Sequence, residues 1–211
     1  MRIALASTWK AKCGISTYTS YLAEELTKNN QVTILSEYPE ISGVDETQKV
    51  EVPNIPCWNR YEDFSKIPEE IKKLKPEILH VQHEFGLFGI NPVMSNNFLE
   101  AMAKINIPKV ITYHSVPLVP HPFFKDYFLK SDKEFCGKIF HNQVALSHAV
   151  NTYGVKKATH INHGVKLCDL SDKEVCRNEL NIGCDSSYIV LMSMGYFGGL
   201  KGVMDNFFNK N

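Results

Sequence analysis

Short apolar segments alternate with amphipathic segments of helical periodicity along most of this chain, and this alternation constrains the fold more than any other feature. Strands are expected at residues 2–7, 32–35, 49–52, 78–82, 109–113, 138–141 and 159–161. Helices are expected between them at residues 15–28, 65–75, 94–104, 123–131 and 143–153. Each helix must return the chain across the sheet, so neighbouring strands run parallel and both faces are covered. The sequence therefore predicts a mostly parallel, Rossmann-like α/β fold.

The composition is that of a globular protein with no electrostatic preference for nucleic acid. Hydrophobic residues make up 44% of the chain and charged residues 22%, which allows a sizeable core. Lys and Arg together number 23, as do Asp and Glu, so no net positive charge attracts nucleic acid. The first residues turn polar too early for a signal peptide, and no run of about 20 apolar residues is present. A cytoplasmic protein is expected.

Neither the cysteines nor the histidines form a recognisable metal-binding motif. The six cysteines lie far apart without a C-x-x-C pair, which predicts buried or unreactive thiols. His80, His83 and Glu84 are possible zinc ligands, but the order H-x-x-H-E is not that of a zincin. Residues three apart on a strand also face opposite sides of the sheet, so the two histidines should diverge. No metal site is expected.

Three loops follow the carboxyl ends of predicted strands, where open parallel sheets bind their ligands. They span residues 8–14, 83–89 and 114–121. The first leads into a helix N-terminus, which favours an anion such as a diphosphate, and Gly14 would let that anion approach the backbone. A turn that merely requires glycine explains Gly14 equally well. The loop has neither the G-x-G-x-x-G nor the Walker pattern, and Glu37 alone is a weak sign of ribose binding.

Four aromatic residues share one face of the helix expected at residues 123–131. They are Phe123, Phe124, Tyr127 and Phe128. Such a stripe usually packs into the core, and we expect that here. The alternative is a surface that seats an apolar acceptor or touches the inner face of a membrane.

Four segments in the same order resemble family-4 retaining glycosyltransferases, which have the two-domain GT-B fold. They are CGISTYT at residues 13–19, HVQHEFGLFG at 80–89, ITYHSVP at 111–117 and INHGV at 161–165. The resemblance covers nearly all of residues 1–165, which would be the N-terminal, acceptor-side domain of a GT-B fold.

The resemblance also implies roles for individual residues. Gly14 would face the donor phosphates across the interdomain cleft, and His114 would contact the transferred sugar as the catalytic residue. The cleft-facing loop with His83, Glu84 and Phe85 would contact the acceptor. No cofactor or metal is implied, because the nucleotide-sugar donor is a substrate.

Beyond residue 165 the family pattern is only partly present. A linker is expected at residues 166–187, followed by the first strand and loop of a truncated donor-binding domain at 188–211. Lys201 matches the lysine that neutralises the donor diphosphate in the family, but the accompanying arginine is missing. The acidic segment that binds the donor ribose and sugar would lie past Asn211.

Two functions remain open from the sequence. The first is transfer of a hexose from a nucleotide sugar to a glycan or lipid-linked acceptor, with retention of configuration. The second is a non-catalytic half that binds the acceptor or docks onto a separate donor-binding domain. A homodimer formed through residues 192–208 is also expected, because an isolated stub of this kind would expose apolar surface.

Overall fold

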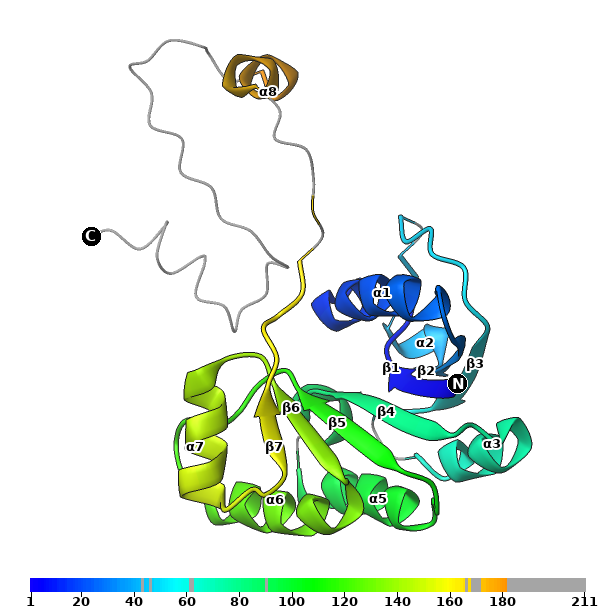
Figure 1. Ribbon diagram of the computed structural model, residues 1–211, viewed down its shortest axis with the longest axis vertical. Coiled ribbons are helices and arrows are strands. Elements are labelled where there is room, and N and C mark those ends of the chain that lie inside the picture. The colour runs from blue at the N-terminus through cyan, green and yellow to red at the C-terminus, as the bar shows by residue number, and fades with distance from the viewer. Residues whose placement is uncertain are drawn as a thin grey trace. The chain divides into compact units, whose positions relative to one another are not determined.

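The computed structural model describes residues 1–42, 44–45, 47–60, 63–89, 91–165, 167 and 172–181 (Figure 1). The chain divides into two compact units, Met1–Val165 and Lys166–Asn211. In the second unit the structure describes one short helix, α8 (Lys173–Glu179), whose first turn is capped by the Asp172 carboxylate. The strand and loop expected at residues 188–202, including Lys201, lie outside the described residues.

The first unit is built on a seven-stranded, all-parallel sheet in the order β3-β2-β1-β4-β5-β6-β7. The strands are β1 (Arg2–Ser7), β2 (Gln31–Glu37), β3 (Asn54–Trp58), β4 (Ile78–His83), β5 (Lys109–Tyr113), β6 (Gly137–Phe140) and β7 (Ala158–His160). The chain winds outward from β1 to β3, returns to β4 beside β1, and then winds the other way. Loops on the two sides of this reversal separate at the carboxyl ends of β1 and β4, where such sheets bind ligands.

Helices cover both faces of the sheet, as predicted (Figure 1). The helices of this unit are α1 (Gly14–Thr27), α2 (Pro39–Ser42), α3 (Lys66–Leu74), α4 (Phe85–Phe88), α5 (Pro92–Ala103), α6 (Pro122–Glu134) and α7 (Gln143–Tyr153). The sheet has a hydrophobic core on each face, and the side chains of β1 alternate between them. Ile3 and Leu5 pack in the smaller core with α1, whereas Ala4 and Ala6 pack in the larger one. The Rossmann-like prediction is confirmed.

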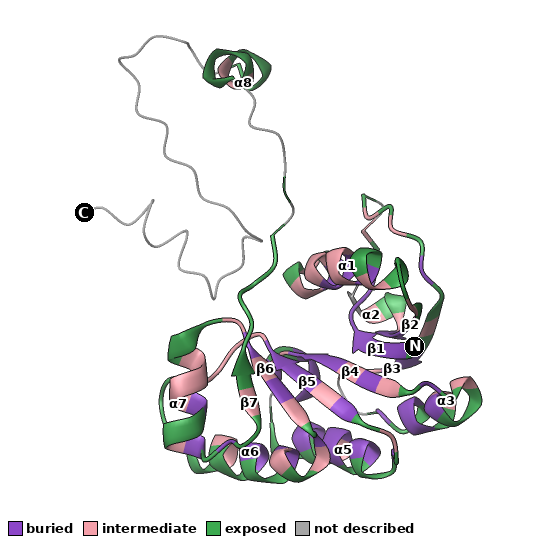
Figure 2. Ribbon diagram, viewed as in Figure 1, coloured by how far each residue is buried: buried purple, intermediate pink, exposed green. Residues whose placement is uncertain are grey.

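Many of the side chains in the larger core are aromatic. Figure 2 shows buried residues in purple along the central strands. Trp58, Phe64, Phe88 and Phe98 contact one another with ring centroids 4.7 to 6.0 Å apart. The indole N–H of Trp58 donates to the Leu35 carbonyl at 2.9 Å, so its polar atom is satisfied inside the core.

The third strand is not where the sequence predicted it. Residues 49–52 form no strand, and β3 instead occupies Asn54–Trp58, which includes Pro56. Proline is tolerated because β3 is the edge strand. The Pro53 carbonyl points toward β2 and accepts a hydrogen bond from Ile34 N–H at 2.8 Å. The backbone polar groups of successive residues in a strand point in opposite directions, so those of Pro56 point away from β2. The N–H that Pro56 lacks is therefore not needed for pairing with β2.

Ser65, the residue before α3, does not cap this helix with its side chain. Ser65 already has helical dihedral angles (φ −64°, ψ −28°) and its side chain makes no capping hydrogen bond. The Asp63 carboxylate accepts from Ser65 N–H at 2.8 Å instead. The helix ends as predicted before Pro76, with Lys75 in the left-handed region.

The aromatic stripe of α6 packs largely as predicted. Tyr127 and Phe128 are fully buried, whereas Phe123 and Phe124 are half-buried. Within the described part of the chain, no helix combines the length and apolar character needed to cross a membrane.

Candidate functional site

The candidate site lies at the carboxyl ends of β1, β4 and β5, beside the reversal of the strand order. His114 directly follows β5, and its backbone N–H donates to the His83 carbonyl at 3.0 Å. Its ring Nε2 lies 2.9 Å from Gln82 Oε1. An amide oxygen only accepts, so His114 Nε2 carries the hydrogen and Nδ1 keeps a lone pair.

The orientation of His114 is fixed by a chain of polar side chains behind it. The Gln82 amide nitrogen lies 3.1 Å from His80 Nε2. His80 Nε2 also lies 2.8 Å from Thr112 Oγ1. Gln82 and Thr112 are buried, so this network holds His114 rigidly at the sheet edge.

His83 lies on the opposite face, as the strand geometry predicted for the pair His80 and His83. Its ring is fully buried and its Nε2 lies 2.6 Å from the Tyr127 hydroxyl. Burial, and to a smaller extent the neighbouring His114, lower the His83 pKa from 6.5 to about 3. The structure therefore places the His83 side chain in the core, where it packs among aromatic rings.

Of the three residues expected to contact an acceptor, Glu84 alone has a partly exposed side chain. Phe85 is only 8% exposed and packs on Phe124 and Tyr127. One Glu84 carboxylate oxygen accepts from Phe85 N–H at 2.9 Å and from Ser115 Oγ at 2.7 Å. Glu84 therefore caps α4 and connects the loop after β4 to the loop after β5.

Gly14 is the first residue of α1 and is exposed. A Cβ atom added to it would meet no atom within 4 Å, and its φ is not in the left-handed region. The backbone conformation at Gly14 therefore does not require glycine, which argues against a turn as the reason for this glycine. The absence of a side chain instead leaves open space in front of the first turn of the helix.

Tyr18 connects this helix N-terminus to His114. It follows Gly14 by one helical turn, and residues four apart lie on the same helix face. Its ring lies 5.0 Å from the His114 ring in an edge-to-face arrangement. The structure therefore brings Gly14 and His114 to the same edge of the sheet. Lys201 lies outside the described residues.

Two further histidines, missed by the sequence analysis, surround Tyr18. His141 follows β6 and His163 follows β7, and their rings lie 5.0 and 4.8 Å from Tyr18. The pKa of His114 is lowered to about 3, first by burial and then by the charges of His141 and His163. Burial likewise lowers the His141 pKa. A histidine near the carboxyl end of each successive strand was the signal that could have found them.

Glu37 cannot serve as a ribose-binding acid in this structure. Its side chain is completely buried and forms a bidentate ion pair with Arg60. It fastens β2 to the segment after β3, and its role is structural.

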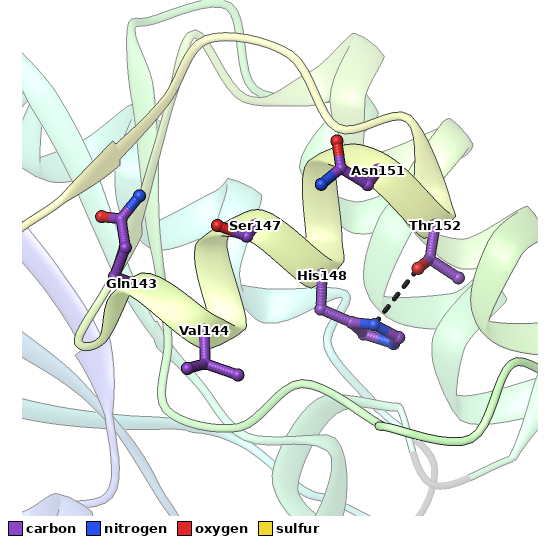
Figure 3. A pocket seen from close by; sticks show the side chains of 6 residues that line it. All are labelled: Gln143, Val144, Ser147, His148, Asn151 and Thr152. Carbon is purple, nitrogen blue, oxygen red and sulfur yellow. Dashed lines mark hydrogen bonds between the residues drawn. The ribbon is translucent and has the colours of Figure 1, made fainter.

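A pocket of about 400 Å³ is lined by side chains of α7 (Figure 3). Its lining includes Val144, Ser147 and His148, and His148 Nδ1 lies 3.1 Å from Thr152 Oγ1. None of the predicted site residues lines it.

A doubly wound, all-parallel sheet covered by helices on both faces defines a Rossmann-like α/β domain. The sequence model of Glycosyltransferase Family 4 matches residues 13–167. The chain therefore belongs to glycosyltransferase family 4, and the predicted GT-B relationship is confirmed.

Solved structures of glycosyltransferases share this fold at low sequence identity. A glycosyltransferase from Rickettsia africae superposes with a TM-score of 0.62 at 19% identity, over 87% of this chain and 50% of the other. Anabaena HepE in complex with UDP-glucose superposes with a TM-score of 0.57 at 12% identity, over 86% and 50%. The chain thus spans about half the length of these proteins. No curated protein matches it in sequence.

Proposed function

We propose that this chain forms the acceptor-side half of a retaining glycosyltransferase. The full site would transfer a hexose from a nucleotide sugar to a glycan or lipid-linked acceptor. One observation carries the proposal. The open N-terminus of α1, at Gly14, lies at the same edge of the sheet as the His114 ring, which Gln82 holds in place. The structures of HepE with UDP and with UDP-glucose support a nucleotide-sugar donor.

Each residue has a distinct task in this proposal. The unpaired backbone N–H groups and the dipole of α1 stabilise negative charge on the leaving diphosphate. Lys201 would add a positive charge to the same group. His114 contacts the transferred sugar, and Gln82 fixes its ring so that little reorganisation is needed during the reaction.

Retention requires no general base from this half of the protein. The departing phosphate accepts the proton of the incoming hydroxyl, so the protein mainly positions the reactants and stabilises charge. The exposed side of the Glu84 loop is the proposed acceptor side. His83 and Phe85 support that loop from within the core.

Calorimetric titration with UDP-glucose, GDP-mannose and UDP tests the donor site. Gly14→Ala should weaken the binding of the preferred donor at least about tenfold, because a methyl group fills the space in front of the helix. Gly86→Ala is the matched control, since Gly86 is also exposed, helical and free of neighbours within 4 Å. Equal binding by Gly14→Ala and wild type would refute the assignment of the phosphate site.

The second candidate is a docking half that needs a separate donor-binding domain. It is favoured by the match to only about half of each related structure. Acceptor binding without any donor binding would support it, and sugar transfer by the purified chain would reject it. Light scattering with and without a donor-binding domain separates such docking from a homodimer.

A further inference from the structure

Three histidines from different loops converge at the carboxyl ends of neighbouring strands. His114 follows β5, His141 follows β6 and His163 follows β7, and these strands lie side by side in the sheet (Figure 1). One ring nitrogen from each histidine lies within 4.8 Å of the others. His114 and His141 are half-buried, and His163 is exposed at the rim.

Each of these rings already uses one nitrogen to donate to a protein oxygen. Carbonyl and amide oxygens only accept, so the nitrogen facing each of them carries the hydrogen. The three bonds are His114 Nε2 to Gln82 Oε1 (2.9 Å), His141 Nδ1 to the Ile161 carbonyl (3.1 Å) and His163 Nδ1 to the Gly164 carbonyl (2.8 Å). The second nitrogen of each ring therefore keeps its lone pair.

The nitrogen that is left on each ring is a hydrogen-bond acceptor and carries no hydrogen. His141 Nε2 is buried and has no hydrogen-bond partner among the described residues. Such a cluster has no N–H group directed at an anion, and its lone pairs suit a cation.

We propose that His114, His141 and His163 bind one divalent transition-metal cation of the Zn²⁺ type, leaving a fourth position open. Neutral imidazoles suit zinc, cobalt, nickel and copper, whereas magnesium and calcium require oxygen ligands. Ligand nitrogens in a tetrahedral zinc site lie about 3.4 Å apart, so each ring must move inward by about 1 Å from the 4.8 Å seen here.

The hydrogen bonds behind the rings are those of an established kind of metal site. Histidines that bind metals usually donate their other N–H to a carbonyl or carboxylate, which fixes the tautomer and the direction of the lone pair. All three rings are held in this way. His114 also belongs to the proposed sugar site, but the cation can be titrated without donor or acceptor, so the outcome does not depend on the proposed sugar transfer.

Calorimetric titration of the EDTA-treated, dialysed chain with ZnCl₂ tests this site. We expect one Zn²⁺ per chain, and His141→Gln or His163→Gln should weaken binding at least about 100-fold. His160→Gln is the matched control, because His160 is exposed on β7 nearby but does not belong to the cluster. It should bind Zn²⁺ as the wild type does.

A second measurement reports the coordination directly. Cobalt(II) should give intense visible absorption bands typical of four-coordinate geometry, and both ligand variants should lose them. Circular dichroism checks folding, and His163→Gln decides the matter if His141→Gln does not fold, since His163 is exposed. No Zn²⁺ binding, or binding that survives both ligand variants, would overturn the proposal.

Discussion

The buried ring of His83 should make the folded state sensitive to acid, and replacing it should remove a defined part of that sensitivity. In the folded chain the His83 pKa is lowered from 6.5 to about 3, chiefly because burial disfavours the charged ring. The unfolded chain therefore binds a proton between these two pH values that the folded chain does not bind. Stability is complete above pH 6.5 and falls as the pH falls through this window.

The size of the loss follows from the two pKa values. One pKa unit corresponds to about 1.4 kcal/mol, so this one residue costs about 2 kcal/mol by pH 5 and about 3 kcal/mol by pH 4. Other buried histidines add their own losses to the wild-type curve. Only the difference between wild type and a His83 variant isolates the contribution of His83.

The assay is urea denaturation of wild type and His83→Phe at pH 8, 6, 5 and 4, in EDTA. Phenylalanine fits the aromatic surroundings but leaves the Tyr127 hydroxyl without its partner, so His83→Phe starts about 1 to 3 kcal/mol less stable. Between pH 8 and pH 5 it should then lose about 2 kcal/mol less than wild type. His160→Gln, at an exposed histidine, should keep the wild-type pH dependence. If His83→Phe follows the wild-type curve in parallel, the argument for a lowered His83 pKa is wrong.

Three further predictions concern stability and are measured by urea denaturation at pH 7.5. Arg60→Met leaves the Glu37 carboxylate buried without its ion pair and should cost about 3 to 5 kcal/mol, and adding Glu37→Leu should recover most of the loss; no recovery would contradict this account. Phe98→Ala removes a fully buried ring and should cost about 3 to 5 kcal/mol, and a cost below about 1 kcal/mol would contradict its core position. Gly154→Ala should cost about 1 kcal/mol because Gly154 ends α7 with φ 74°, whereas Gly14→Ala should cost nothing. Equal effects of the two alanine substitutions would contradict the backbone argument.

Most of the fold was predictable because its central elements are buried on both sides. The predicted bounds of β1, β5 and α7 agree with the structure at both ends. The sequence of β3 contains no such apolar run, because an edge strand needs only one paired side and tolerates a proline. Its position was decided by pairing with β2, which is a long-range contact.

The site was less predictable than the fold. The resemblance singled out Gly14 and His114, and the structure places both at the same sheet edge, although their roles remain predictions. His163 lies in the INHGV segment of the resemblance and His141 in none of its segments, and neither residue was given a role, since they come together with His114 only through the adjacency of β5, β6 and β7. The position of His83 opposite His80 followed from the strand period, but its burial and its hydrogen bond to Tyr127 depend on where α6 packs.

The sequence by itself determined the alternation of strands and helices, because local periodicity dictates which segments can bury an apolar face. That alternation predicts a parallel sheet, but it does not predict the order of the strands within the sheet. Tertiary structure decided the order, and with it which loops meet at the carboxyl edge. The physical reason is that a polar side chain at the end of a strand gains its partners from neighbouring strands, and these neighbours are distant in the chain.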